Sequence, residues 1–437
     1  MPQERETRPD YTYRDPTLSL WQSAAAAMTS TARTGLEALE SQNVFMTPVH
    51  AVASAAEGNR EAPTAELESV AVVGDCAKVA SQFLWAEIRG DRELAAQCAA
   101  ELRKAVCDAA GWSTCLTNYL KFKAEGGNFP YLGNKNPVVS IDETFRIALV
   151  GDWGTGEDAA VNLLAQVKSQ SPDLLLHLGD IYYSCTQEEA AKNFLDKCRA
   201  TFPPNFPLFT LCGNHDMYSG GNGYYWLLSQ IEQQASYFLL ENSNWQLLAM
   251  DTGHNDSNPI TVASYMTSVN PKEVDWLRDK IKTAGPACKT ILLSHHQLFS
   301  PFAAVGRVDG RPYAYNPNLY RNFQDVLGQV AWWFWGHEHN LAVYEPYMGL
   351  ERGRCVGCSA VPVFKNQQSY TLDRTLVTLD KGQFPVWATA AELGNNGTDY
   401  NHAFAILTLR GKSASVDYFE VPINQAGSRL WSEPYDG

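Results

Sequence analysis

Residues that can bind metal ions follow five separate apolar runs in this chain of 437 residues. In chain order the run ends supply Asp152, then Asp180 with Tyr183, then Asn214 with His215, then His295 with His296, and last His337 with His339. Carboxylate, amide and imidazole ligands in this combination suit iron, zinc or manganese better than calcium. The spacing therefore predicts a transition-metal site built from several distant segments.

The number of these ligands exceeds what one ion needs. Two carboxylates, an amide oxygen and three imidazoles are too many for a single ion that also binds water. We therefore expect two ions, roughly 3.5–4 Å apart, that share one carboxylate. His337 and His339 are two residues apart on an extended segment, so each can face a different ion. Gly213 and Gly336 allow tight turns just before the ligands.

Alternating apolar runs and helical stretches must position these residues. Strands are expected at 145–150, 173–178, 208–212, 246–250, 290–293 and 330–335. Helices are expected from Ala159 to Ser169 and from Glu188 to Ala200. This alternation predicts an α/β domain with mostly parallel strands, whose carboxyl ends carry the ligands.

The last part of the chain predicts further strands with little helix between them. They are expected at 354–364, 375–379, 384–389, 402–409 and 414–421. We interpret them as a second sheet packed on the first.

The first 142 residues have a different texture and are interpreted as a separate region. A polar tail is followed by a proline-free stretch with apolar residues at helical spacing. Asp91 is the expected N-cap of a helix that carries Leu94, Cys98, Leu102 and Val106. Residues 121–142 are rich in Gly, Asn and Pro and predict a linker. We therefore divide the chain into an all-helical region with its tail and linker at 1–142 and a second domain at 143–437 that carries the predicted ligands. For the helices we favour structural support over a lid or partner surface.

Composition limits the partners and the compartment. The net charge of -14 argues against nucleic acid as the main partner, because phosphate backbones select basic surfaces. No apolar run approaches the length of a membrane span, and the charged amino terminus has no signal-peptide core. We expect a cytoplasmic protein, unless the chain is the processed form of a secreted one. Cys355 and Cys358 form a CxxC pair without further Cys or His nearby, so we interpret them as packing residues.

The motif series GD-x-G, GD-x-x-Y, GNHD, a strand ending in His, and GH-x-H resembles the calcineurin-like metallophosphoesterase superfamily. More narrowly it is similar to the purple acid phosphatases, and the match covers residues 143 to about 365. The resemblance implies a four-layer αββα metallophosphoesterase sandwich, with the N-terminal helical region as an addition.

Two details favour the purple acid branch. Gly154 stands where most of the superfamily has histidine, and purple acid phosphatases replace that imidazole with a tyrosine three residues after the second aspartate, here Tyr183. A phenolate ligand favours a ferric ion, and charge transfer between the two gives the family its colour. Tyr182 would point to the opposite side of an extended segment, so we assign it to packing.

The resemblance also implies how the ligands divide between the two ions. The ferric ion, Fe3+, would be held by Asp152, Asp180, Tyr183 and His339. A divalent ion, Fe2+, Zn2+ or Mn2+, would be held by Asp180, Asn214, His295 and His337. No organic cofactor is expected.

The activity that the resemblance implies is hydrolysis of phosphate monoesters by attack of a metal-bound hydroxide. His215 is expected to contact the phosphoryl group or protonate the leaving oxygen, and His296 is the second candidate for that role. Asp216 is expected to orient a neighbouring group. Phosphodiester or pyrophosphate hydrolysis on the same dinuclear site remains an alternative, as do phosphoramidate or peroxidative chemistry and a non-catalytic metal-binding scaffold.

Two loops are candidates for choosing the substrate, which we expect to be small and phosphorylated. Residues 217–226 are rich in glycine and aromatic residues, and residues 297–320 carry Arg307 and Arg311. Either arginine could hold a phosphate or a carboxylate, and an ordinary surface position is about as probable for both.

Overall fold

The computed structural model describes residues 91–94, 97, 136–182, 184–257, 266–285, 287–363, 365, 369–380, 382–422 and 425–436. Backbone contacts divide the chain into two compact units, one of residues 1–126 with 259–261 and one of residues 127–258 with 262–437. In the first unit, Asp91 Oδ1 accepts the backbone N–H of Leu94 at 3.1 Å, as the predicted N-cap requires. Most of the predicted helical region, the tail and much of the linker lie outside the described residues.

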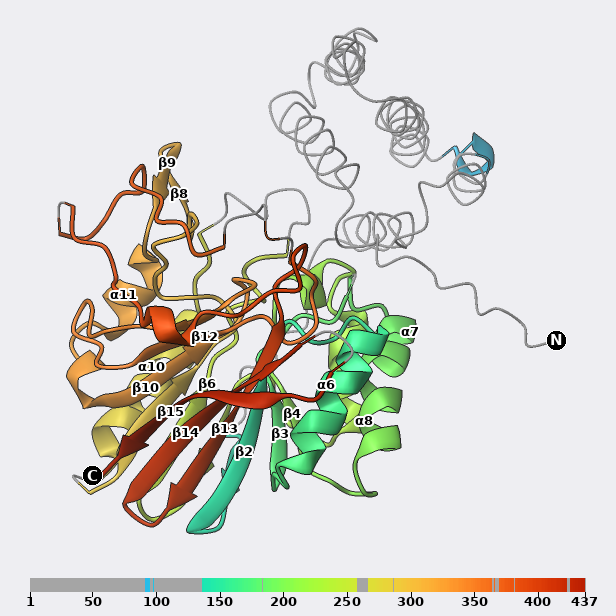
Figure 1. Ribbon diagram of the computed structural model, residues 1–437, viewed down its shortest axis with the longest axis horizontal. Coiled ribbons are helices and arrows are strands. Elements are labelled where there is room, and N and C mark those ends of the chain that lie inside the picture. The colour runs from blue at the N-terminus through green and yellow to red at the C-terminus, as the bar shows by residue number, and fades with distance from the viewer. Residues whose placement is uncertain are drawn as a thin grey trace, which may run out of the picture. The chain divides into compact units, whose positions relative to one another are not determined.

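The second unit contains two large sheets, whose strands come from both ends of the unit (Figure 1). The seven-stranded sheet has the order β1 (Val138–Ser140), β5 (Phe238–Glu241), β6 (Trp245–Ala249), β7 (Lys289–Leu293), β10 (Val330–Trp335), β12 (Gly353–Val356) and β11 (Leu341–Val343). The six-stranded sheet has the order β15 (Ser428–Tyr435), β14 (Ser413–Val421), β13 (His402–Arg410), β2 (Thr144–Val150), β3 (Leu174–His177) and β4 (Leu208–Thr210). A separate hairpin pairs β8 (Gly306–Val308) with β9 (Arg311–Tyr313).

Helices cover the outer face of each sheet. Next to the six-stranded sheet lie α6 (Asp158–Ser169), α7 (Gln187–Glu189), a π-helical turn (Ala190–Leu195), α8 (Asp196–Thr201) and α9 (Asn222–Gln230). Next to the seven-stranded sheet lie α10 (Pro271–Thr283) and α11 (Pro317–Phe323). Short 3-10 turns span His215–Met217, Leu327–Gln329 and Thr389–Ala391. None of the helices in the described part of the chain has the length and apolarity needed to cross a bilayer.

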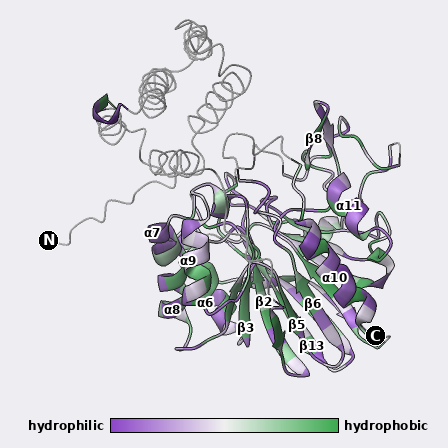
Figure 2. Cartoon of the chain, turned by 180° about the vertical axis from the view of Figure 1, so that it is seen from behind, coloured by the Kyte–Doolittle hydropathy of each residue, from purple (hydrophilic) through white to green (hydrophobic). Residues whose placement is uncertain are grey.

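The apolar pattern of the central strands explains the layers. Ile147 and Leu149 of β2 face the core between the two sheets, whereas Ala148 and Val150 pack under the helices. A strand buried on both faces needs such a continuous apolar run. In Figure 2 the central strands are largely hydrophobic, whereas the helices carry both hydrophilic and hydrophobic residues. The four-layer αββα sandwich expected from the sequence is therefore confirmed.

The strands that lie nearest the ligands are parallel. β2 pairs in parallel with β3, and β3 with β4. In the other sheet β6, β7, β10 and β12 are all parallel neighbours. Parallel strands end at the same edge of a sheet, so the segments that follow them gather there.

The prediction that the late strands form a separate sheet is wrong. β13 pairs antiparallel with β2 and with β14, so β13 and β14 belong to the same six-stranded sheet as β2. Residues 375–379 and 384–389 are described but form no strand, apart from single bridges at Val377 and Trp387. The strand at 354–364 ends at Val356. An apolar run indicates that a segment is buried, but it does not indicate which strand the segment pairs with.

Candidate metal centre

Asp152 is the first predicted ligand, and it lies two residues after the end of β2. Its backbone has φ 54°, a left-handed conformation that is costly for a residue with a side chain. Oδ2 accepts the backbone N–H of His337 at 2.8 Å, which fixes the carboxylate. Oδ1 then lies 3.3 Å from His339 Nε2. The first and last of the five motifs therefore meet.

Asp180 lies between two groups of side chains. Its backbone also has positive φ, 75°. Oδ1 accepts the backbone N–H of His215 at 3.0 Å and lies 3.3 Å from His295 Nε2. Oδ2 faces the other way, 3.4 Å from the hydroxyl of Tyr182. The two oxygens of one carboxylate thus serve two neighbouring sites.

The predicted amide and imidazole ligands form a compact triangle. Asn214 Oδ1 lies 3.1 Å from His295 Nε2 and 2.9 Å from His337 Nδ1, and the two ring nitrogens are 3.2 Å apart. His295 Nδ1 lies 2.9 Å from the carbonyl oxygen of Leu178. A carbonyl only accepts, so Nδ1 carries a proton, and Nε2 is the ring nitrogen that is left to bind a metal.

Tyr182 is at the site, and its assignment to packing is wrong. Its hydroxyl lies 3.0 Å from Asp152 Oδ1 and 3.3 Å from His339 Nε2. The prediction assumed an extended segment, but the chain turns here, with the N–H of Cys185 bonded to the carbonyl of Ile181 at 3.0 Å. Tyr183, the predicted tyrosine ligand, lies outside the described residues.

We call Asp152, Tyr182 and His339 the first half of the cluster, and Asn214, His295 and His337 the second half, with Asp180 between them. The separations within each half are close to the ~3.0 Å edge of an octahedron whose metal–ligand bonds are ~2.1 Å. Each half therefore fits one ion, and their donor set of carboxylates, imidazoles, an amide and a phenol suits iron, zinc or manganese.

The protonation of the imidazoles in the cluster is also consistent with a metal site. Burial alone lowers the pKa of His295, but the Asp180 carboxylate outweighs it and raises that pKa to about 9. Burial and the neighbouring His295 lower the pKa of His337 to about 3, so this ring is neutral and can donate a lone pair. A cation in the second half would replace the proton of His295, as metal binding to imidazole does generally.

Glycines make the close approach possible. A Cβ on Gly213 would lie 2.1 Å from Asp180 Oδ1, and one on Gly336 would lie 2.7 Å from Asp152 Oδ2. Gly179 has φ 104°, and a Cβ there would lie 2.6 Å from His295 Nδ1. These positions exclude any side chain, which explains the Gly in front of three of the ligand motifs.

His215 and Asp216 follow the predicted ligand Asn214. The ring of His215 packs against Tyr182 and Tyr218, with centroid distances of 4.6 and 4.7 Å, beside the cluster. Asp216 is buried and accepts the backbone N–H groups of Asp180 at 3.0 Å, Ile181 at 3.1 Å and Gly213 at 2.7 Å. Burial, with the nearby Asp180 carboxylate, raises the pKa of Asp216 to about 7. Asp216 thus holds the Asp180 loop in place, as expected of an orienting residue.

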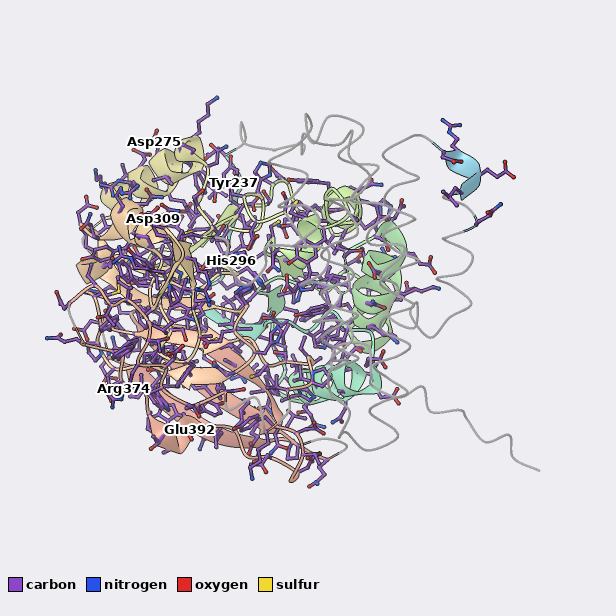
Figure 3. The ribbon with its side chains drawn as sticks, turned by 90° about the horizontal axis from the view of Figure 1, so that it is seen from above. Tyr237, Asp275, His296, Asp309, Arg374 and Glu392 are labelled. Atoms are coloured by element: carbon purple, nitrogen blue, oxygen red, sulfur yellow. The ribbon has the colours of Figure 1, made fainter. Side chains whose placement is uncertain are left out.

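His296, labelled in Figure 3, is buried, and its ring is 4.5 Å from that of His337. Nδ1 lies 2.9 Å from Thr252 Oγ1, and Nε2 lies 3.1 Å from Asp256 Oδ2. With both ring nitrogens engaged, His296 is less suited than His215 to protonate a leaving group. Thr252 and Asp256 were missed by sequence reasoning, because the segment DTGHND after β6 matches no ligand motif.

The predicted substrate arginines do not join the cluster. Arg307 and Arg311 are exposed on the β8–β9 hairpin, and Arg307 Nη1 donates to the carbonyl of Gly310 at 3.1 Å. Tyr224 is buried in α9 and donates to the carbonyl of Thr210, so it is a core residue. Loop composition alone did not reveal which of these side chains face solvent.

A cavity of about 210 Å³ lies beside the first half of the cluster. Phe302, Ala303, Glu338, His339 and Asn340 are among its lining residues. The His339 side chain is 36% exposed, whereas those of Asp152, Asp180 and His295 are at most 1% exposed. Of these four side chains, that of His339 is the most exposed. A larger cavity of about 620 Å³, lined by Phe202, Phe206 and Phe209, contains no residue of the cluster.

The CxxC pair is buried and takes no part in the cluster. Cys355 Sγ donates to the carbonyl of Glu338 at 3.2 Å, and burial raises the pKa of both thiols. Neither thiol is a ready thiolate, in keeping with their interpretation as packing residues.

Solved structures with similar folds share little sequence with this chain. A purple acid phosphatase from yellow lupin seeds is 13% identical, with a TM-score of 0.44 over 70% of this chain and 55% of the lupin chain. GAP50 of Plasmodium is 12% identical, with a TM-score of 0.43 over 66% and 88%. A Vps29 mutant from Entamoeba histolytica is 10% identical, with a TM-score of 0.30 over 67% and 99%. Similarity at this level says nothing about the substrate of this chain.

A family model matches the central part of the chain. No curated protein matches the chain significantly. The family model of the calcineurin-like phosphoesterases matches residues 145–341, from the start of β2 to the start of β11, and this range contains every residue of the cluster. Members of this family use a dinuclear metal site, as the two halves of the cluster would provide. The chain therefore contains a calcineurin-like phosphoesterase domain.

Proposed function

We propose that this protein hydrolyses phosphate monoesters with two metal ions, in the manner of a purple acid phosphatase. The observation that carries the proposal is the position of Asp180, whose two carboxylate oxygens face separate sets of ligands. A shared carboxylate between two complete half-sites is what a dinuclear hydrolase needs. If the protein bound only a single structural ion, one of the two sets of potential ligands would bind nothing.

The two halves suggest different ions. The first half and Asp180 offer two carboxylates, a phenol and an imidazole, which favour Fe3+. The second half and Asp180 offer an amide, two imidazoles and a carboxylate, which suit Fe2+, Zn2+ or Mn2+. Bound there, the two cations would neutralise phosphoryl oxygens and lower the pKa of a water molecule at the site.

The chain's own residues would orient the ester and move the proton. His215 is only 8% exposed, and its backbone N–H is bonded to Asp180, so its ring is held at the edge of the cluster. From there we infer that it donates a hydrogen bond to the phosphoryl group or a proton to the leaving oxygen. His296 would position His337 rather than contact the substrate.

We expect the substrate to be a small monoester. The cavity beside His339 has a volume of about 210 Å³ and opens to solvent, so it does not by itself exclude the second alcohol group of a diester. Phosphodiester or pyrophosphate hydrolysis therefore remains the second candidate function, and a non-catalytic metal-binding scaffold remains the third.

A panel of substrates tests the proposal. Metal-loaded protein would be assayed with matched mono- and diesters, such as 4-nitrophenyl phosphate and bis(4-nitrophenyl) phosphate, and with pyrophosphate. We expect the highest kcat/KM for the monoester, with activity lost on chelation and in Asp180→Asn. A preference for the diester or pyrophosphate supports the second candidate. Hydrolysis of none of these compounds by protein with two bound ions would overturn the enzymatic proposal.

A further inference from the structure

We infer that Glu338 and Asn340 recognise a primary ammonium group on the alcohol part of the substrate, so that the preferred substrates are phosphate monoesters of short amino alcohols. The inference rests on the phosphomonoesterase function proposed above and names the substrate class of the same site. Two buried oxygen atoms carry it. They belong to residues that line the cavity beside His339, and they lack hydrogen-bond partners within the described residues.

Glu338 has one carboxylate oxygen fixed and the other free. Ser300 Oγ accepts the backbone N–H groups of Phe302 at 3.0 Å and Ala303 at 3.4 Å, so its own proton is left to donate. Glu338 Oε1 lies 2.7 Å from Ser300 Oγ and accepts that proton. Glu338 Oε2 is buried and has no partner among the described residues. The loop that follows β7 therefore holds the carboxylate at the cavity and leaves one oxygen for a ligand.

Asn340 supplies the second acceptor. Its side chain is buried, and Oδ1 has no hydrogen-bond partner in the described part of the chain. Its backbone is fixed on both sides, because the N–H donates to the carbonyl of Glu338 at 2.7 Å and the carbonyl accepts from the N–H of Gly357 at 3.1 Å. Carboxylate and amide oxygens only accept hydrogen bonds, and buried acceptors without a partner are costly. The two oxygens therefore favour a ligand that brings its own donors.

The number of acceptors and their charge select the donor. A primary ammonium group has three N–H donors and a positive charge, so it can serve both oxygens and pair with the Glu338 carboxylate. A hydroxyl group offers one donor and no charge. A quaternary ammonium group has the charge but no N–H. Of these three groups, the primary ammonium matches the two acceptors best.

The position and size of the cavity limit the length of the alcohol. His339, which would hold an ion of the first half, lines the same cavity as Glu338 and Asn340. The volume of about 210 Å³ equals that of about seven water molecules at ~30 Å³ each. The terminal torsion of a glutamate side chain is broad, so a small rotation turns Oε2 toward a ligand in the cavity. An ester whose phosphoryl group lies at the ions thus has room for a short chain that ends in an ammonium group.

The test compares three esters that differ in the group at the end of the alcohol. Ethanolamine phosphate carries a primary ammonium group, n-propyl phosphate carries a methyl group in its place, and choline phosphate carries the positive charge without N–H donors. For metal-loaded protein at about pH 8, where primary amines stay protonated, we expect kcat/KM for ethanolamine phosphate to exceed both others by about 10–100-fold. Equal kcat/KM for ethanolamine phosphate and choline phosphate would overturn the inference.

Matched variants assign this preference to the two residues. Glu338→Gln keeps the shape of the side chain and removes its charge, and Asn340→Leu removes the amide oxygen at similar volume. Both should bring the kcat/KM ratio of ethanolamine phosphate to choline phosphate close to one. Glu351→Gln makes the same charge change at an exposed residue that does not line the cavity, so it should keep the wild-type ratio. A wild-type ratio in folded Glu338→Gln or Asn340→Leu would overturn the inference.

A binding measurement separates the inference from the proposed function. 3-Aminopropylphosphonate and n-butylphosphonate have the same shape and contain no ester bond, so calorimetric titration of metal-loaded protein measures recognition without turnover. We expect the aminophosphonate to bind about 10–100-fold more tightly to the wild type, and this preference to be lost in Glu338→Gln. Equal Kd values in the wild type would overturn the inference. A clear preference without hydrolysis of any ester would refute the proposed function alone.

Discussion

Substitution of Gly213 by alanine perturbs the cluster without removing a ligand. The new Cβ would lie 2.1 Å from Asp180 Oδ1 and 2.7 Å from the Asp180 backbone nitrogen. An ordinary contact begins near 3.4 Å, so the carboxylate oxygen must move by about 1 Å. Because this oxygen faces the second half of the cluster, we expect kcat/KM to fall by about 100-fold, the usual effect of such a displacement. Overpacking should also cost about 1–3 kcal/mol of stability.

The matched control is Gly328→Ala in the 3-10 turn before β10. A Cβ at Gly328 meets no atom within 4 Å, so the same chemical change is made in open space. Both variants would be assayed for phosphomonoester hydrolysis, metal content and urea unfolding. The reasoning predicts that Gly213→Ala also loses one or both ions, whereas Gly328→Ala resembles the wild type. A Gly213→Ala protein with full metal content and unchanged kcat/KM would show that Asp180 does not hold the ions.

Three further predictions follow from the same contacts. His215→Ala should lower kcat by about 10²–10⁴-fold with metal content unchanged, and an equal loss of metal would argue for a structural role instead. Chelation of the metal should lower the melting temperature, because an ion at 100 times its Kd adds about 2.7 kcal/mol to the free energy of unfolding. An unchanged melting temperature would contradict a metal-bound native state. Glu433 is bonded to Arg354 at 2.5 Å and to Tyr418 at 2.6 Å, and although burial opposes it, these contacts lower the Glu433 pKa from its usual 4.5. A lowered carboxylate pKa adds stability above pH 4.5, and this stability is lost as the pH falls through the folded-state pKa. In urea titrations, the free energy of unfolding of Glu433→Gln should therefore be about 3 kcal/mol lower at neutral pH and should depend less on pH below 5. If the free energies of unfolding of the variant and the wild type changed with pH in parallel, the reasoning would be refuted.

The fold was predictable because the strands are buried on both faces. The predicted runs at 145–150 and 330–335 correspond to β2 and β10, since a continuous apolar run has few other uses in a domain of this size. The partners of the late strands were not predictable. β13 pairs with β2, which lies more than 250 residues earlier in the chain. The residue types of the two strands do not indicate that they pair with each other.

The positions of the candidate ligands were predictable because Asp152, Asp180, Asn214 and His337 each follow a glycine, and His295 lies two residues after the end of β7. Asp152, Asp180, Asn214, His295, His337 and His339 all meet in one place, as their motifs require. The position of Tyr182 at the cluster was not predictable. The direction of its side chain depends on the positive φ of Asp180 and on the turn that follows, and no residue type in the segment indicates that turn. The same holds for Asp256, which reaches His296 from a loop without a motif.

The division of the cluster into two ion sites can be tested most directly by anomalous scattering from crystals of metal-loaded protein. We expect two anomalous peaks on opposite sides of Asp180, roughly 3.5–4 Å apart, one beside Asp152 and His339 and the other among Asn214, His295 and His337. A single peak at full metal loading, or peaks away from Asp180, would contradict the account.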